Sequence, residues 1–221
     1  VFFTLGILLI ILGVAMMVPV VFQLIYNEFD STFITSGIIT ITFGVLFFLS
    51  NIDHLKLINT QQAFLLTALS WLCIATFGSL PFFFSELDLS ITDSFFESMS
   101  GITTTGATIL NNIESSPKGI LMWRSMLQWL GGIGVILMAI TLMPIMNIGG
   151  MQLLKISAYD TSEKILPKSK EISKTLITVY ISLTFLCALF YKIFGMNTFD
   201  SLTHSMTCLL YTSPSPRDRE K

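Results

Sequence analysis

Five long apolar stretches divide this chain, and they constrain its fold more than any other feature. Each is close to the roughly 20 residues that an α-helix needs to cross about 30 Å of hydrocarbon. With 52% hydrophobic residues, 12% charged residues and a mean hydropathy of +0.76, the chain is too apolar for a soluble domain, in which about 25% of residues are charged. The sequence therefore predicts an all-α integral membrane protein that spans the bilayer at residues 2–25, 33–50, 63–84, 119–145 and 173–194.

The composition also excludes several functional classes. A formal charge of −2 excludes a strongly basic nucleic-acid-binding protein. Cys73, Cys187 and Cys208 are scattered without metal-ligand spacing, and we interpret them as small packing residues. The apolar stretches contain no Ser/His/Asp set and no His-Glu-x-x-His motif, so we expect no enzymatic activity and no cofactor.

The distribution of charge predicts the orientation of the chain. Five lysines lie between residues 146 and 174, and Lys56 falls on the same side of the membrane if all five stretches span it. By the positive-inside rule this side is cytoplasmic. The opposite loops carry mainly carboxylates, which favours the collection of cations, at Glu28, Asp30, Glu86, Asp88, Asp93 and Glu114.

A short helix is predicted between the third and fourth stretches. Pro81 is expected to end or kink the third stretch near its outer end. Good N-cap types occur at Ser90, Thr92 and Asp93, and Ser94-x-x-Glu97 has capping-box spacing. We therefore expect a helix that begins at residues 91–94 and ends at Gly101, with Glu97 as a capping carboxylate rather than a vestibule charge. About two turns are too few to cross a bilayer but suit a re-entrant pore helix.

The loop that follows, Thr103-Thr104-Thr105-Gly106, is the candidate ion site. The C-terminal end of the preceding helix carries roughly half a negative elementary charge, which attracts a cation. Polar backbone at membrane depth is tolerated only where it is buried in protein or lines a water-filled cavity. We expect the loop to run extended, with Gly106 free in its backbone angles, so that its carbonyls replace the hydration shell of an ion. The alternative is a membrane scaffold in which this loop only packs.

An internal repeat supports the first interpretation. A shift of 107 residues aligns Asp93-Ser94 with Asp200-Ser201 and residues 98–100 with residues 205–207, in each case after an apolar stretch. The repeat indicates two helix–pore-loop–helix units, the second incomplete.

Five motifs follow one another along the chain: Phe96–Thr108, Pro117-Lys118-Gly119, Trp123-Arg124-Ser125, Gln128–Gly134 and Gly149–Leu153. Together they resemble the Trk/Ktr/HKT superfamily and, within it, the TrkH-type potassium-uptake membrane subunits. The resemblance extends from about residue 1 to residue 207 and is most specific in the Thr/Gly loop and in the Trp-Leu-Gly-Gly-Ile-Gly helix.

The resemblance implies four pseudo-repeated helix–pore-loop–helix units of the potassium-channel-like type around one pore, preceded by two extra helices. In this chain the extra helices would occupy residues 1–50, the first unit residues 51–145, a cytoplasmic connection residues 146–172 and an incomplete second unit residues 173–207.

The resemblance also implies a function. The backbone carbonyls of Thr103, Thr104, Thr105 and Gly106 would supply one quarter of a filter for K⁺, the transported ion, in a multi-pass protein of the bacterial inner membrane. The expected partners are membrane lipid, a second copy of the full-length protein and a cytoplasmic nucleotide-binding (RCK/KTN) regulatory subunit of TrkA type. A sodium-permeable or Na⁺/K⁺ transporter of the same superfamily is the alternative.

The sequence departs from the family pattern after Thr207. Ser213 stands where a filter glycine is expected, and a Pro-rich charged tail replaces the next helix. We interpret residues 208–221 as a non-native tail resembling a translated cloning sequence, and we expect the chain to be an N-terminal fragment.

Two further features lie in the fourth stretch. Arg124, near its outer end, is expected to snorkel to the headgroups or to pair with an acidic outer loop. Gly131-Gly132-x-Gly134 is expected to allow close helix packing rather than to bind a nucleotide, because no strand precedes it.

Overall fold

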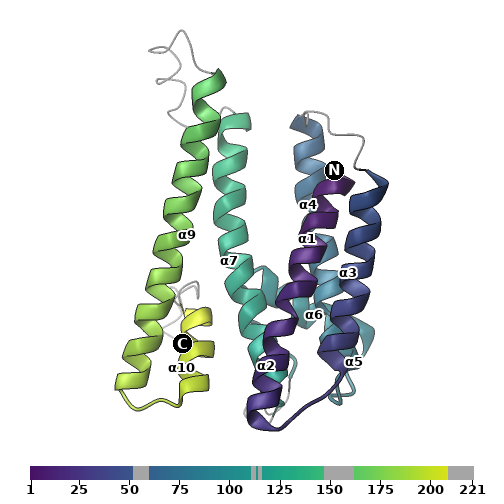
Figure 1. Ribbon diagram of the computed structural model, residues 1–221, viewed down its shortest axis with the longest axis vertical. Helices are drawn as coiled ribbons and strands as arrows, with labels where there is room; N and C mark the ends of the chain where they lie inside the picture. The colour runs from purple at the N-terminus through teal and green to yellow at the C-terminus, as the bar shows by residue number, and fades with distance from the viewer. Residues whose placement is uncertain (52–59, 111–112, 114–115, 147–161, 209–221) are drawn as a thin grey trace, which may run out of the picture.

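The structure is a computed structural model, and it describes residues 1–51, 60–110, 113, 116–146 and 162–208 (Figure 1). Within those residues it is helical without any strand, which confirms the predicted all-α class. The helices are α1 (Phe2–Ala15), α2 (Met17–Tyr26), α3 (Thr32–Ser50), α4 (Thr60–Gly78), α5 (Leu80–Phe84), α6 (Ile91–Ile102), α7 (Lys118–Met146), α9 (Ser162–Ile193) and α10 (Thr198–Cys208).

Five helical segments are long and apolar enough to cross a membrane. Each overlaps one of the apolar stretches in the sequence, so the prediction of a multi-pass membrane protein is confirmed. The segments are Phe2–Tyr26, Thr32–Ser50, Gln61–Phe84, Lys118–Met138 and Glu171–Ile193.

Proline interrupts two of these spans. The first breaks at Met16, between α1 and α2, because Pro19 has no N–H to donate to the carbonyl one turn earlier, at Ala15. The third breaks at Ser79, two residues before Pro81, which occupies the first turn of α5. The predicted kink at Pro81 is confirmed.

Successive spans run in alternating directions. In Figure 1 the turns that join α2 to α3, α5 to α6 and α9 to α10 lie at the lower end of the molecule. The C-terminal ends of α3 and α7 lie at the upper end. The carboxylates of Glu28, Asp30, Glu86 and Asp88 therefore gather at one end, as the orientation argument requires.

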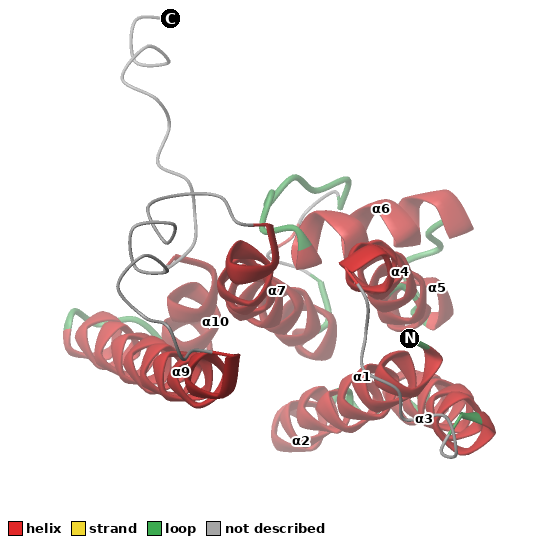
Figure 2. Cartoon of the chain, turned by 90° about the horizontal axis from the view of Figure 1, so that it is seen from above, coloured by secondary structure: helices red, strands yellow, loops and turns green. Residues whose placement is uncertain are grey.

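Helices α1 and α3 approach each other closely, and α6 lies between α4 and α7 (Figure 2). A Cβ atom on Gly6 of α1 would lie only 2.7 Å from the carbonyl oxygen of Gly44 of α3, so the contact requires a residue without a side chain. Contacts through small residues are typical of membrane helices, where dispersion contacts replace much of the hydrophobic driving force.

The core is a cluster of buried residues centred on α7, with members from α1, α3, α4, α5, α6 and α10. Trp123 is fully buried, and its indole N–H donates to the carbonyl oxygen of Gly78 at 2.9 Å. Its ring packs edge-on against Phe33 at a centroid distance of 6.3 Å. A Cβ atom on Gly131 would lie 1.9 Å from the carbonyl oxygen of Ile102. This confirms the predicted close packing at Gly131, which lets the end of α6 rest against α7.

Helix α10 occupies the position that the internal repeat predicts. It begins at Thr198, which is 107 residues after Ile91 at the start of α6. It packs against α9 and α7. Its first turn carries Asp200, as the first turn of α6 carries Asp93.

The predicted connection over residues 146–172 is partly helical. Helix α9 begins at Ser162 and runs without a break to Ile193, but its membrane-spanning part begins at Glu171, so the connection stays a prediction. Lys and Glu are good helix formers, so a polar segment can extend an apolar helix beyond the membrane. The remainder of that connection, residues 147–161, lies outside the described residues, as do residues 209–221 of the predicted tail.

Candidate functional site

The candidate site begins with the N-terminus of α6. Ser90 is the N-cap: its hydroxyl oxygen accepts the backbone N–H of Asp93 at 3.1 Å, and its O–H donates to the Asp93 carboxylate at 2.7 Å. The predicted box of Ser94 and Glu97 is therefore wrong, because both side chains lie further along the helix and are fully buried. The start of the helix, at Ile91, falls within the predicted range.

Helix α6 is also longer than predicted, with 12 residues in place of about two turns. Gly101 does not end it. Instead, a Cβ atom on Gly101 would lie 3.1 Å from the Cβ of Leu127, so this glycine allows α6 to approach α7. A glycine in a membrane helix serves packing as readily as termination.

The helix ends in a Schellman motif. The N–H of Thr105 donates to the carbonyl oxygen of Ser100 at 3.0 Å, and the N–H of Thr104 donates to that of Gly101 at 2.9 Å. Thr104 is the left-handed residue of the motif, with φ of 58°. Glycine normally occupies this position, because a β-branched side chain resists positive φ.

The loop is therefore a turn and not the extended run predicted from sequence. Besides Thr104, Gly106 has a positive φ of 74°, which is the backbone freedom that the sequence predicts for this glycine. Reversals of this kind allow a short segment to direct several backbone groups to one side.

The amide groups of the loop all point back to the helix end. In addition to the two bonds of the Schellman motif, the N–H of Thr103 donates to the Met99 carbonyl at 3.0 Å and that of Gly106 to the Ser100 carbonyl at 3.4 Å. Within the described residues, no hydrogen bond reaches the carbonyl oxygens of Thr103, Thr104 or Thr105. In that part of the chain, three carbonyl oxygens of the loop thus have no hydrogen-bond partner.

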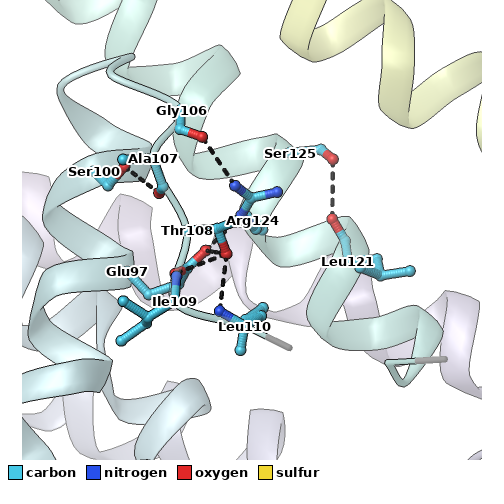
Figure 3. Close-up of polar contacts among 10 residues, drawn as sticks. All are labelled: Glu97, Ser100, Gly106, Ala107, Thr108, Ile109, Leu110, Leu121, Arg124 and Ser125. Carbon is cyan, nitrogen blue, oxygen red and sulfur yellow. Dashed lines mark hydrogen bonds and ion pairs between the residues drawn. The ribbon is translucent and has the colours of Figure 1, made fainter. Parts of the chain in front are cut away.

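The fourth carbonyl of the predicted filter has a partner. The Nη2 of Arg124, on α7, donates to the carbonyl oxygen of Gly106 at 3.3 Å (Figure 3). The Nε of the same guanidinium lies 2.5 Å from Glu97 Oε1 on α6, and the two side chains form an ion pair. Glu97 is 0% exposed and Arg124 is 20% exposed. Of the two predictions for Arg124, pairing is therefore correct, but the partner is Glu97 on α6 and not an outer-loop carboxylate.

Glu97 also forms hydrogen bonds with the residues that follow the Thr/Gly loop. Its carboxylate accepts the hydroxyl of Thr108 at 3.0 and 3.1 Å and the backbone N–H of Ile109 at 3.2 Å. One turn later on α6, the hydroxyl of Ser100 donates to the Ala107 carbonyl at 2.5 Å. Residues 106–109 are thereby fastened to α6 and α7 together (Figure 3).

A sequence signal for this network exists. Charged side chains in apolar segments are rare and almost always paired, so Glu97 and Arg124 on successive membrane segments are each other's natural partners. The repeat offers no second copy of the pair in the described residues, because His204 occupies the position equivalent to Glu97. Its Nδ1 lies 2.8 Å from the carbonyl oxygen of Asp200.

The described carboxylates at the same end of the molecule are not grouped as a metal centre. The described part of the chain contains no group of three or more metal-ligating side chains. Glu28 and Asp30 line a hollow of about 350 Å³ that includes no residue of the Thr/Gly loop. Both act as helix caps: Glu28 accepts the N–H of Lys118 at 2.9 Å, and Asp30 accepts the N–H of Thr32 at 3.3 Å.

These features define a polytopic helical membrane protein in which a short helix, and a loop with three unbonded carbonyl oxygens among the described residues, lie between two spans. The chain belongs to the TrkH family: the family model, described as a cation transport protein, matches residues 30–209. This confirms the resemblance inferred from the motifs.

Several relatives match most of the chain. It is 35% identical to the Trk system potassium uptake protein TrkH of Vibrio parahaemolyticus over 96% of this chain and 45% of the relative. It is 37% identical to TrkH of Escherichia coli K12, over the same shares. It is also 37% identical to TrkI of Halomonas elongata, over 93% of this chain and 42% of the relative.

The crystal structure of the potassium transporter TrkH from Vibrio parahaemolyticus has the same fold. The two superpose with a TM-score of 0.80 at 34% identity, over 93% of this chain and 42% of that one. The chain thus spans less than half the length of the relatives it matches.

Proposed function

We propose that this chain is the N-terminal part of the membrane subunit of a potassium uptake system in a bacterial inner membrane. One observation carries the proposal: the loop amides of Thr103, Thr104 and Thr105 are bonded to the end of α6, while their carbonyl oxygens remain unbonded within the described residues. A dehydrated monovalent cation is bound in channels by rings of such carbonyls. The names of the relatives, which are potassium uptake proteins, support K⁺ as the ion.

The repeat supports a pore built from several such loops. We propose that residues 1–50 form two accessory helices, residues 51–145 a first helix–pore-loop–helix unit and residues 173–207 part of a second, joined through residues 146–172. Carbonyls from one loop cannot surround an ion, so the remaining units would lie in the part of the protein that this chain does not cover.

The partners follow from the same proposal. The relatives are named as members of a Trk system, which implies further components. We propose that the full-length protein forms a homodimer and binds a cytoplasmic nucleotide-binding subunit of TrkA type. The contact we expect on this chain is the lysine-bearing segment of residues 146–174.

Two alternatives are distinguished by one experiment. Gly106→Val in the full-length protein places a β-branched side chain at a φ of 74° within the loop. We expect K⁺-dependent growth of an uptake-deficient host to be lost and the selectivity of residual Rb⁺ over Na⁺ flux to fall. Flux of Na⁺ at the K⁺ rate in the unaltered protein would favour the sodium-permeable alternative, and unchanged growth of the variant would favour a scaffold.

The matched control is Gly195→Val. Gly195 also has a positive φ, of 99°, but it lies in the turn between α9 and α10, and a Cβ atom added there would have no described atom within 4 Å. The substitution imposes similar backbone strain outside the Thr/Gly loop. We expect this variant to support growth at equal abundance in the membrane.

A further inference from the structure

We infer that Arg124 and Glu97 form an electrically neutral clamp that withdraws the Gly106 carbonyl from the ion and leaves the carbonyls of Thr103, Thr104 and Thr105 to bind it. The inference rests on the proposed function, because it assigns roles at the same loop. It makes Arg124 and Glu97 positioning residues of the filter, with an effect on ion affinity.

The first step concerns the Gly106 carbonyl. Its oxygen accepts a hydrogen bond from Arg124 Nη2 at 3.3 Å, so the negative end of the carbonyl dipole faces the positive charge of the guanidinium. A cation on the same oxygen would lie close to the guanidinium and be repelled by it. The other three carbonyls have no such partner among the residues described.

The second step concerns the charge of Arg124. An uncompensated guanidinium beside the loop would raise the electrostatic potential at the ion and weaken its binding, since such interactions are strong away from bulk water. Glu97 cancels this charge: it is fully buried, and its carboxylate is held by Arg124, Thr108 and Ile109 together. The carboxylate is thus fixed in the one place where it neutralises the guanidinium.

The third step separates this role from simple fastening. If the pair only held the loop in shape, weakening it would reduce the amount of folded protein or the maximal rate of uptake. If the pair instead sets the electrostatic potential at the ion, the KM for K⁺ should change with the net charge of the pair. Charge and shape can be varied separately, because glutamine is close to isosteric with glutamate and can still form hydrogen bonds.

The test uses the full-length protein in an uptake-deficient host, with Rb⁺ uptake measured as a function of concentration and normalised to membrane abundance. Glu97→Gln leaves the positive charge of Arg124 without a counter-charge, and we expect KM to rise at least tenfold. A tenfold rise corresponds to about 1.4 kcal/mol of binding free energy. The double variant Glu97→Gln with Arg124→Gln has no charge to balance, and we expect its KM to return to within about threefold of the original value. If Glu97→Gln fails to accumulate, Arg124→Gln replaces it: this variant leaves the Glu97 carboxylate unbalanced, so KM should fall, and a KM that does not fall would refute the charge argument.

Two further variants complete the test. Glu86→Gln makes the same chemical change on an exposed side chain at the same end of the molecule, and we expect KM to be unchanged. Arg124→Lys keeps the charge, but a single ammonium group cannot reproduce the fork that contacts both Glu97 and Gly106. We expect this variant to alter the Rb⁺/Na⁺ selectivity ratio by releasing the Gly106 carbonyl.

The clamp would be refuted by a KM that stays constant across the charge variants, or by a double variant with a KM as high as that of Glu97→Gln. Either result, in a protein whose uptake is still abolished by Gly106→Val, leaves the proposed function standing. Failure of Gly106→Val to affect uptake would instead overturn the proposed function itself.

Discussion

The carbonyl oxygen of Ile102, the last residue of α6, lies directly against Gly131 of α7, with room for no side chain between them. This contact joins the end of the pore-type helix to the middle of the following span. The loop of Thr103–Gly106 starts at that point, so its position depends on the contact.

We predict that Gly131→Ala displaces the end of α6. The added Cβ would lie 1.9 Å from the Ile102 carbonyl oxygen, and overpacking of this kind costs about 1–3 kcal/mol. The melting temperature of the purified full-length protein in detergent should fall, and K⁺ uptake at equal abundance should fall with it. Gly134→Ala is the control, because no described atom lies within 4 Å of its Cβ position; an equal loss in both variants would contradict the prediction.

Thr104 is predicted to tolerate glycine. Its φ of 58° is strained for a β-branched residue, and relief of roughly 1–2 kcal/mol should offset the flexibility that glycine adds to the unfolded chain. Thr104→Gly should therefore melt at or above the original temperature. Thr105, which does not have a positive φ, is the comparison: Thr105→Gly should lower the melting temperature. The reverse order of the two variants would show that the left-handed turn is not formed.

The N-cap of α6 gives a paired prediction. Ser90→Ala removes the acceptor for the Asp93 N–H and should cost about 1 kcal/mol. Ser94→Ala should be neutral or stabilising, because the Ser94 hydroxyl is buried without a hydrogen-bond partner in the described structure. Thermal unfolding of the two variants measures the difference. Greater damage from Ser94→Ala would restore the capping box predicted from the sequence.

We also predict that Trp123→Phe destabilises the junction of α4 and α7. The change removes the indole donor from the Gly78 carbonyl, and an unsatisfied buried acceptor costs about 1–3 kcal/mol. Trp71→Phe is a suitable control, since its indole N–H donates to the sulfur of Met138, at 3.5 Å, which is a weak acceptor. A smaller fall in melting temperature for Trp123→Phe than for Trp71→Phe would argue against this assignment.

Much of the fold was predictable because membrane insertion depends on local stretches of the chain. An apolar run of sufficient length must satisfy its backbone hydrogen bonds internally, so the spans could be located from residues 2–25 onward without tertiary information. The break at Pro81 was predictable for the same reason, since a missing N–H has the same effect in any surroundings. The repeat aligned Asp200-Ser201 with Asp93-Ser94, and both pairs lie in the first turns of helices, α10 and α6.

The errors occurred where a residue had two possible roles. Gly101 and Glu97 each fit a local pattern, a helix stop and a capping carboxylate, but in the structure both face α7. Local patterns do not report the neighbour across a helix interface, so they misassigned both residues. The left-handed Thr104 was missed because propensity argues against it.

The sequence by itself determined the membrane spans, the place of the short helix and loop between them, and membership of the TrkH family, because hydropathy and motif spacing are properties of neighbouring residues. The tertiary structure alone decided which loop carbonyls remain unbonded among the described residues and that Arg124 meets both Glu97 and Gly106. Those relationships join residues 18 and 27 positions apart on different helices, and only packing of α6 against α7 brings them within hydrogen-bonding distance.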